Sequence, residues 1–126
     1  MRDDFHKPTK EILAKRVAYL CSNPKCRVRT LGPSSEKDKT VSIGVAAHIS
    51  AAAEGGKRYN DDLSPDQRSS ADNGIWLCQN CGKLIDSDEN EFTVDLLKNW
   101  KTEAEAEARK KNWSKGTGST SPLFRT

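Results

Sequence analysis

Apolar residues recur along the chain with helical and strand periods, and these periods predict its first elements. Residues 9–20 (TKEILAKRVAYL) predict a short helix with Thr9 as its N-cap. One side of this helix would carry the apolar residues Ile12, Leu13, Val17 and Leu20. The segment CSNPKC (21–26) ends the helix with an Asn-Pro turn, and the polar, turn-rich stretch 31–40 is typical of a solvated loop.

Alternation in residues 41–50 (VSIGVAAHIS) predicts the clearest strand of the chain. One face would pack on the core through Val41, Ile43, Val45, Ala47 and Ile49. The other face is small and polar, and His48 is its only large side chain. Because successive side chains point to opposite faces of a strand, we expect His48 to point away from the core, towards an open surface or cleft.

Residues 51–74 predict a long loop, which contains a Gly55-Gly56 turn and a short helix near 65–70. A loop of this length inside a compact domain is more often functional than not. The segment IWLC (75–78) is typical of a short buried strand. The QNCGKLID segment that follows it predicts the first turns of a helix.

Residues 94–113 (VDLLKNWKTEAEAEARKKNW) predict a long helix with Thr93 as its N-cap. Its apolar stripe consists of Leu97, Trp100, Ala104 and Ala108. Two favourable charge pairs, Glu105–Arg109 and Glu107–Lys111, are spaced four residues apart on it. The Gly/Ser/Thr-rich tail 114–126 is typical of a linker, so we expect residues 1–113 to form one domain of a longer protein.

Composition limits the classes of protein that fit this chain. It has 126 residues, of which 34% are hydrophobic and 31% are charged, so its core is thin and a staple is expected. No apolar run is long enough to cross a membrane, and MRDDFHKPTK has no apolar signal region, so we expect a cytoplasmic protein. The net charge is +3, but basic residues predominate in 1–40 and acidic residues in 41–90. This layout suits an anionic partner held near a cation-binding site.

Four cysteines provide the candidate staple, as the pairs Cys21-x4-Cys26 and Cys78-x2-Cys81. Thiolates at such short spacing can converge on one zinc ion, and in a cytoplasmic chain they favour a metal over disulfides. Because the core is thin, zinc binding would contribute directly to the free energy of folding. A redox role for the second pair is the alternative, but no thioredoxin-like βαβ pattern surrounds it. A closed site of four thiolates is structural, since it leaves no open position for catalysis.

Several features around the cysteine pairs stand in the order found in the HNH endonucleases, which this chain resembles. They are AAHI (46–49), Gly55-Gly56, Asn73 in DNGIWLC, and the helix that opens at CGKLID. The wider run GVAAHISAAAEGGKRYN…DNGIWLCQNCGKLIDSDENEFTVDLLKNWK is most similar to HNH domains of bacterial anti-phage (CBASS) effectors, where the nuclease is joined to a SAVED sensor domain. The resemblance implies an α+β fold. It would have a ββα-metal (HNH, or His-Me finger) core, framed by the four-cysteine zinc site and flanked by an N-terminal helix and a long C-terminal helix.

The resemblance also implies hydrolysis of DNA phosphodiester bonds, which needs a deprotonated water, a cation and a stabilised leaving oxygen. His48 would be the general base, since an imidazole near its ordinary pKa can accept the water's proton at neutral pH. It could instead be a metal ligand, or a surface histidine without a role. Asn73 would orient the base by bonding across the loop, or would only form an Asx turn before Gly74.

The ligands of the catalytic metal depart from the family pattern. Ala47 stands before the histidine, where the family commonly has Asp, Glu or His, and Gly82 follows the last cysteine, where His or Asn is common. Asp86 lies four residues after Gly82, on the same helix face. It would bind Mg²⁺ or Mn²⁺ together with waters and the scissile phosphate, or would be a solvated acid beside Asp88.

Basic residues near these positions would contact the DNA backbone. The chief candidates are Lys57, Arg58 and Lys83, and the basic knuckle residues Lys25, Arg27 and Arg29 could follow the backbone too. Each of them could equally be a solvated cation. The tryptophans Trp76, Trp100 and Trp113 are expected in the core rather than stacked on bases.

These expectations favour a metal-dependent, largely sequence-nonspecific endonuclease that acts on double-stranded DNA. The resemblance implies that it is the effector nuclease of a ligand-activated antiviral defence protein and that it self-associates on activation. A cyclic oligonucleotide would act only through a sensor domain that is not present in this chain. The alternative is a zinc-stapled DNA-binding module without catalytic activity, which Ala47 and Gly82 favour. A redox or zinc-storage protein is a third alternative.

Overall fold

Small antiparallel sheets and helices make up residues 2–113, the part of the chain that this computed structural model describes. The elements in chain order are α1 (Lys7–Arg16), β1 (Leu31–Pro33), β2 (Thr40–Ser42), β3 (Gly44–His48), α2 (Pro65–Arg68), the 3₁₀ turn η1 (Ala71–Asn73), β4 (Gly74–Cys78), α3 (Gln79–Ser87) and α4 (Val94–Trp113). The fold is therefore mixed α and β, as the sequence predicts. The expected linker, 114–126, lies outside the described residues.

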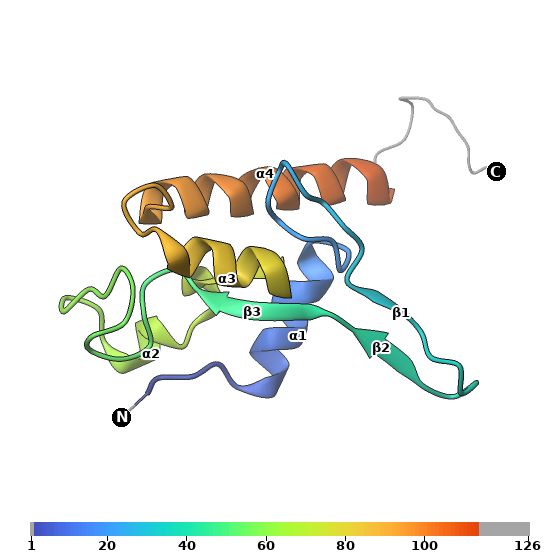
Figure 1. Cartoon of the computed structure of the whole chain (residues 1–126), viewed down its shortest axis with the longest axis horizontal. Coiled ribbons are helices and arrows are strands. Elements are labelled where there is room, and N and C mark those ends of the chain that lie inside the picture. The colour runs from blue at the N-terminus through green and yellow to red at the C-terminus, as the bar shows by residue number, and fades with distance from the viewer. Residues whose placement is uncertain (1, 114–126) are drawn as a thin grey trace.

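The β3–β4 hairpin lies at the centre of the molecule, with helices on both sides (Figure 1). Its antiparallel register runs from Gly44 opposite Cys78 to His48 opposite Gly74. One face packs against α3 and α4 in a core of buried residues that includes Ile75, Leu77, Ile85, Leu97 and Trp100. The other face packs against the N-terminal segment and α1 in a second core that includes Phe5, Leu13, Val17 and Trp76. The hairpin is thus covered on both faces, which positions the ends of its strands firmly.

The strand predicted over 41–50 is two strands, because the chain changes partner at Ile43. The backbone N–H of Ile43 donates to Thr30 (2.8 Å) and its carbonyl accepts from Gln79 (3.0 Å), so this residue bridges two different segments. Val41 and Ile43 are 53% and 44% exposed, so their expected place in the core is wrong. The stretch predicted as a loop instead forms a hairpin of β1 and β2, which projects from the body of the molecule in Figure 1.

The first helix begins and ends earlier than the sequence predicts. Its N-cap is His6, not Thr9, because Pro8 fits the first turn of a helix and does not have to precede it. The helix ends at Arg16, before Ala18 and Tyr19 adopt left-handed backbone angles (φ 55° and 62°). The buried residues of this region are Leu13, Ala14 and Val17, whereas Ile12, which was expected on the buried side, is 49% exposed.

The long C-terminal helix follows the prediction closely. Thr93 caps it, since its Oγ1 accepts from the backbone N–H of Leu96 (3.2 Å). Its stripe is buried at Leu97, Trp100 and Ala104, and half-buried at Ala108. The pair Glu107–Lys111 is present at 3.2 Å, and Glu105 contacts Arg16 of α1 (2.8 Å) and Lys101 (3.5 Å). Trp76 is buried as expected, and the side chain of Trp113 lies outside what the structure describes.

Candidate functional site

The four cysteines converge on one point, as their spacing predicts. All four are free thiols, and their Sγ atoms lie within 4.8 Å of one another. The Sγ atoms of Cys26 and Cys78 are 3.9 Å apart. Tetrahedral zinc, with Zn–S bonds of about 2.3 Å, requires sulfur atoms about 3.8 Å apart. The cluster could therefore hold a metal ion such as zinc.

Tight backbone turns place both cysteine pairs. The left-handed residues Ala18 and Tyr19 turn the chain from α1 towards Cys21, and a turn from Asn23 (backbone N–H of Cys26 to its carbonyl, 2.9 Å) brings Cys26 back. Cys78 ends β4 and is also the N-cap of α3, and Cys81 lies in the first turn of that helix. A metal here would tie the end of the first helix to the junction of the central hairpin and α3.

Hydrogen bonds to the sulfur atoms and burial make this cluster suitable for a cation. The Asn23 amide donates to the Sγ of Cys81 (3.4 Å), and the Cys81 backbone N–H donates to the Sγ of Cys78 (3.4 Å). Burial raises the pKa of the Cys21 and Cys81 thiols, and a bound cation would favour their thiolate forms. Within residues 2–113, no other group of three or more His, Cys, Asp or Glu side chains is arranged to hold a metal.

His48, the last residue of β3, is half-buried rather than open. The N-terminal segment covers the strand face that was expected to be free, and the Phe5 ring stacks on the imidazole (centroids 3.9 Å apart, planes at 10°). The imidazole Nε2 lies 3.0 Å from the backbone oxygen of Asp3, and a carbonyl only accepts, so Nε2 donates. Burial lowers the pKa of His48, so the ring is neutral at pH 7. Its other nitrogen, Nδ1, then keeps a lone pair.

Asn73 joins the two ends of the loop between β3 and β4. Its buried amide donates to the carbonyls of Ser50 (2.9 Å) and Arg68 (3.0 Å), and its Oδ1 accepts from the Ser50 backbone N–H (2.9 Å). The backbone adds a bond from Ile49 N–H to the Asn73 carbonyl (2.8 Å). These partners lie up to 23 residues earlier, so Asn73 is more than a local Asx turn. Its side chain fixes the chain immediately after His48.

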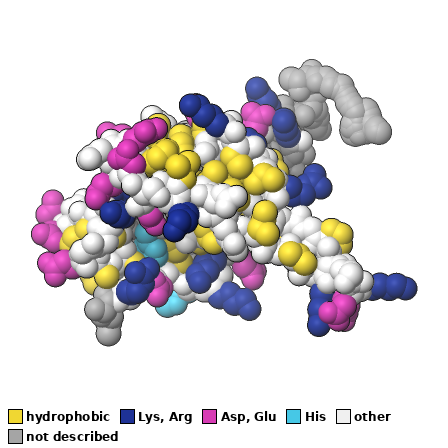
Figure 2. Space-filling view, in the orientation of Figure 1, with side chains coloured by type: hydrophobic (Ala, Val, Ile, Leu, Met, Phe, Trp, Pro, Cys, Tyr) yellow, Lys and Arg dark blue, Asp and Glu magenta, His cyan; other side chains and the backbone are white. Residues whose placement is uncertain are grey.

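A hollow of about 570 Å³ brings most of the expected site residues together. Its lining includes His48, Lys57, Arg58, Lys83 and Asp86, with Ala47 and Gly82 among the small residues. Arg2 adds a fourth basic side chain, and Asp86 is the one acidic residue in this lining. Figure 2 shows cyan histidine side chains among dark blue Lys and Arg side chains on this side of the molecule. The excess of basic groups suits an anionic ligand such as a phosphate.

Arg58 braces the protein from inside and does not present a free cation to a ligand. Its side chain is only 4% exposed, which argues against its expected contact with DNA. Its Nε donates to the carbonyl of Ile49 (2.7 Å), Nη1 to those of Ile85 (2.9 Å) and Phe92 (3.4 Å), and Nη2 to Asp86 (3.1 Å). The guanidinium therefore joins the loop after β3 to the C-terminal end of α3.

The other charged residues of the hollow remain more accessible. Asp86 is 60% exposed, and one of its oxygens accepts from Arg58. Lys57 is half-exposed, with its Nζ 3.8 Å from a carboxylate oxygen of Glu89, and Lys83 is exposed on α3. A single carboxylate that already has a basic partner does not form a cage for Mg²⁺, which prefers six oxygen ligands. The lining residues alone therefore do not make a preformed magnesium site.

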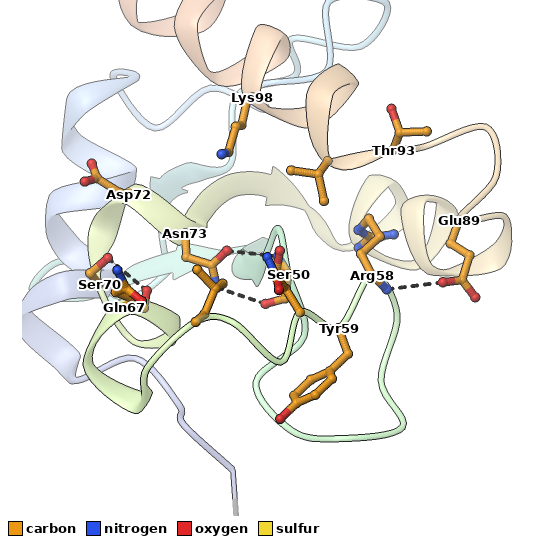
Figure 3. A pocket seen from close by; sticks show the side chains of 13 residues that line it. Ser50, Arg58, Tyr59, Gln67, Ser70, Asp72, Asn73, Glu89, Thr93 and Lys98 are labelled. Atoms are coloured by element: carbon orange, nitrogen blue, oxygen red, sulfur yellow. Dashed lines mark hydrogen bonds between the residues drawn. The ribbon is translucent and has the colours of Figure 1, made fainter.

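A second hollow, of about 620 Å³, lies on the other side of the loop, between α2, η1 and the start of α4 (Figure 3). The Ser50–Asn73 hydrogen bonds lie at its centre, and Lys98 points over it from α4. Its charged lining is balanced, with Arg58 and Lys98 against Asp72 and Glu89. An anion has less reason to bind there than in the first hollow, which contains His48.

Three residues that contact this region were not predicted from the sequence: Asp3, Phe5 and Ser50. Each acts through a contact between distant segments, such as the 45-residue separation of Asp3 and His48. The one available signal was Phe5, a lone aromatic residue in a charged N-terminal stretch. Because large apolar side chains tend to be buried, this residue could have been expected to pack against another side chain of the domain.

Comparisons with known proteins leave the geometry as the basis for any function. Among residues 2–113, no helix combines the length and the apolar character needed to cross a bilayer. No protein-family model matches the chain, and no curated protein matches it either.

Proposed function

We propose that this protein hydrolyses phosphodiester bonds of double-stranded DNA as an HNH-type endonuclease, with His48 as the general base. In the proposed step, Nδ1 of His48 accepts a proton from a water molecule. The water oxygen forms a bond to phosphorus while the bond from phosphorus to the leaving deoxyribose oxygen breaks, and that oxygen takes up a proton from solvent. The charges of Asp3 and Asp4 favour the positive charge that develops on the imidazole, whereas the charge of Arg2 opposes it.

The observation that carries this proposal is the state of the His48 ring at the edge of a basic hollow. A neutral imidazole with one nitrogen hydrogen-bonded to a carbonyl has one lone pair of known position, which is what a general base needs. Because the hollow is mainly basic, a phosphate is the ligand most favoured there. Lys57 and Lys83 would hold the DNA backbone without reading its sequence.

The arrangement around His48 supports an HNH-type core. The hairpin of β3 and β4 is followed directly by α3, which packs on it, and this order is that of a ββα-metal unit. His48 ends the first of these strands, and Asn73 holds the following residues. The cysteine cluster would bind zinc as a structural ion at the start of α3. The catalytic cation, Mg²⁺ or Mn²⁺, would bind weakly through Asp86 until DNA supplied phosphate oxygens.

The biological setting that we propose follows from the same resemblance. The domain would serve as the effector nuclease of a ligand-activated, bacterial anti-phage protein, and would act in the cytoplasm. Cleavage of both strands would require two nuclease domains, so activation would involve self-association. A cyclic oligonucleotide would act through a separate sensor domain and not through residues 2–113.

Plasmid cleavage tests the proposal. The zinc-loaded full chain should nick supercoiled plasmid when Mg²⁺ or Mn²⁺ is added. Because general acid–base catalysis typically contributes 10²–10⁴-fold, His48→Ala should lower the rate by at least about 100-fold. His6→Ala is the matched control, since His6 is the other histidine of the chain and is exposed at the start of α1. A thermal melt of each variant shows whether it is folded.

The main alternative is a DNA-binding module without catalytic activity. The contact between Arg58 and Asp86 favours this alternative, because the guanidinium competes with a metal cation for the Asp86 carboxylate. Cleavage by His48→Ala at the parent rate would refute the role of His48. If no metal supports cleavage, the assay is repeated with the chain fused to a dimerising coiled coil. Intact plasmid there as well, with DNA binding retained in a gel shift, would establish the alternative.

A further inference from the structure

The extended N-terminal segment, residues 2–6, lies along His48, and we call it the N-terminal strap. Figure 1 shows it as the ribbon that leads into α1 below β3. It is fixed at three points: the Asp3 N–H donates to the carbonyl of Ala52 (2.9 Å), the Asp3 carboxylate pairs with Arg68 (3.3 Å), and Phe5 is 5% exposed. Arg68 is itself buried and lies over the Tyr59 ring (4.7 Å). The strap is therefore part of the packed structure.

Two contacts of the strap act on the imidazole in different ways. The Asp3 carbonyl, 3.0 Å from Nε2, stabilises the tautomer with the proton on Nε2. The Phe5 ring, stacked at 3.9 Å, fixes the plane of the imidazole and removes water from that face. A free histidine has neither constraint, since it exchanges between tautomers and rotates about its side-chain bonds.

We propose that Asp3 and Phe5 are positioning residues, which determine which nitrogen of His48 is available and hold the ring in the orientation for catalysis. This inference rests on the proposed role of His48 as a general base. It assigns a function in the site to a segment more than forty residues away along the chain. A missing or displaced strap would leave the base present but poorly oriented.

Electrostatics around the ring agree with this role. Burial is the largest influence and lowers the pKa of His48, and Arg2 lowers it further. Asp3, through its backbone hydrogen bond and its charge, and Asp4 oppose this shift. Four further charged residues line the same hollow as His48: Lys57, Arg58, Lys83 and Asp86. Removal of the Phe5 ring would readmit water, so the pKa of His48 should rise towards the ordinary value of about 6.5.

NMR of the histidine ring tests the inference without relying on cleavage. In the full chain carrying His6→Ala, the remaining histidine signals come from His48, and ¹H–¹⁵N spectra of the ring distinguish the two tautomers. We expect a dominant Nε2–H form and a pKa below about 6.5. Addition of Phe5→Leu should let the ring rotate away from the Asp3 carbonyl, so that the tautomers mix, and should raise the pKa of His48. The kcat of cleavage should then fall with an unchanged KM, and the acid limb of its pH profile should move to higher pH.

The matched control is Phe92→Leu, since Phe92 is also buried (8% exposed) and contacts Trp100 instead of His48. It should lower stability to a similar extent and leave the tautomer and the pKa of His48 unchanged. An Nδ1–H tautomer in the His6→Ala protein would overturn the inference, even if Phe5→Leu failed to fold. Equal effects of the two phenylalanine substitutions would overturn it as well. The expected spectra together with full cleavage by His48→Ala would instead refute the proposed function and leave the ring geometry standing.

Discussion

Asn73→Ala tests whether one buried amide holds the loop that follows His48. The substitution removes three hydrogen bonds, two donated to the carbonyls of Ser50 and Arg68 and one accepted from the Ser50 N–H. Each is worth about 0.5–1.5 kcal/mol net, and buried partners left unpaired add to the loss. We therefore expect the free energy of unfolding to fall by about 3 kcal/mol, which is a large part of the 5–15 kcal/mol typical of a domain.

Urea denaturation of the zinc-loaded chain, followed by tryptophan fluorescence, measures this change. With a slope of about 2 kcal/mol/M, a loss of about 3 kcal/mol lowers the midpoint by about 1.5 M. The control is Asn99→Ala, because Asn99 is exposed on α4 and its replacement should change stability by less than about 0.5 kcal/mol. Equal midpoints for the two variants would refute the reasoning. The loop would then be held by its backbone bonds alone, including that of Ile49 to Asn73.

Three further predictions concern the metal, the bracing arginine and an ion pair. The purified chain should contain one zinc per molecule by elemental analysis, and Cys21→Ser or a strong chelator should remove the metal and lower the thermal midpoint. Arg58→Ala should cost about 3 kcal/mol in urea denaturation because it leaves three carbonyls without their donor, whereas Lys57→Ala, at an exposed pair, should cost less than about 1 kcal/mol. The hydrogen bond from Arg16 lowers the pKa of Glu105, so the ion pair stabilises the fold at neutral pH, and this stabilisation is lost as the pH falls below the ordinary value of 4.5. In Glu105→Gln, the urea midpoint should therefore depend less on pH in that range.

Local signals predicted those elements whose stability depends on neighbouring residues in the sequence. The long helix α4 was predicted with its cap because Thr93 and the apolar stripe are both visible within a few turns. The cysteine pairs were predicted to converge because each pair is close in sequence, and one metal can then join both. The strand β4 and the helix α3 follow from a short apolar run that ends at Cys78.

Contacts between distant segments determine those parts of the fold and of the candidate site that could not be predicted from the sequence. Alternation continues through Ile43, but the backbone of this residue bonds Thr30 and Gln79, so the strand is divided there. His48 was placed on the correct strand, yet its cover comes from Asp3 and Phe5, which no periodicity relates to it. Arg58 is a basic residue in a polar loop, and such residues are usually exposed. Its burial depends on carbonyls that only the folded chain brings together.

The hydrogen bonds between Ser50 and Asn73 determine where the loop between β3 and β4 can change in length. Since the hydrogen bonds join the loop at its two ends, its closure does not depend on the exposed residues in the middle of the loop, whereas Ala52, Arg58 and Arg68 make contacts that support the surroundings of His48. Each doubling of such a segment costs only about 0.6 kcal/mol in closure entropy. Insertions and grafted peptides should therefore be tolerated at the exposed residues Asp61 and Asp62, which lie outside the contacts of Arg58 and Arg68. A scaffold of this kind can acquire new surface contacts while its chemistry stays the same.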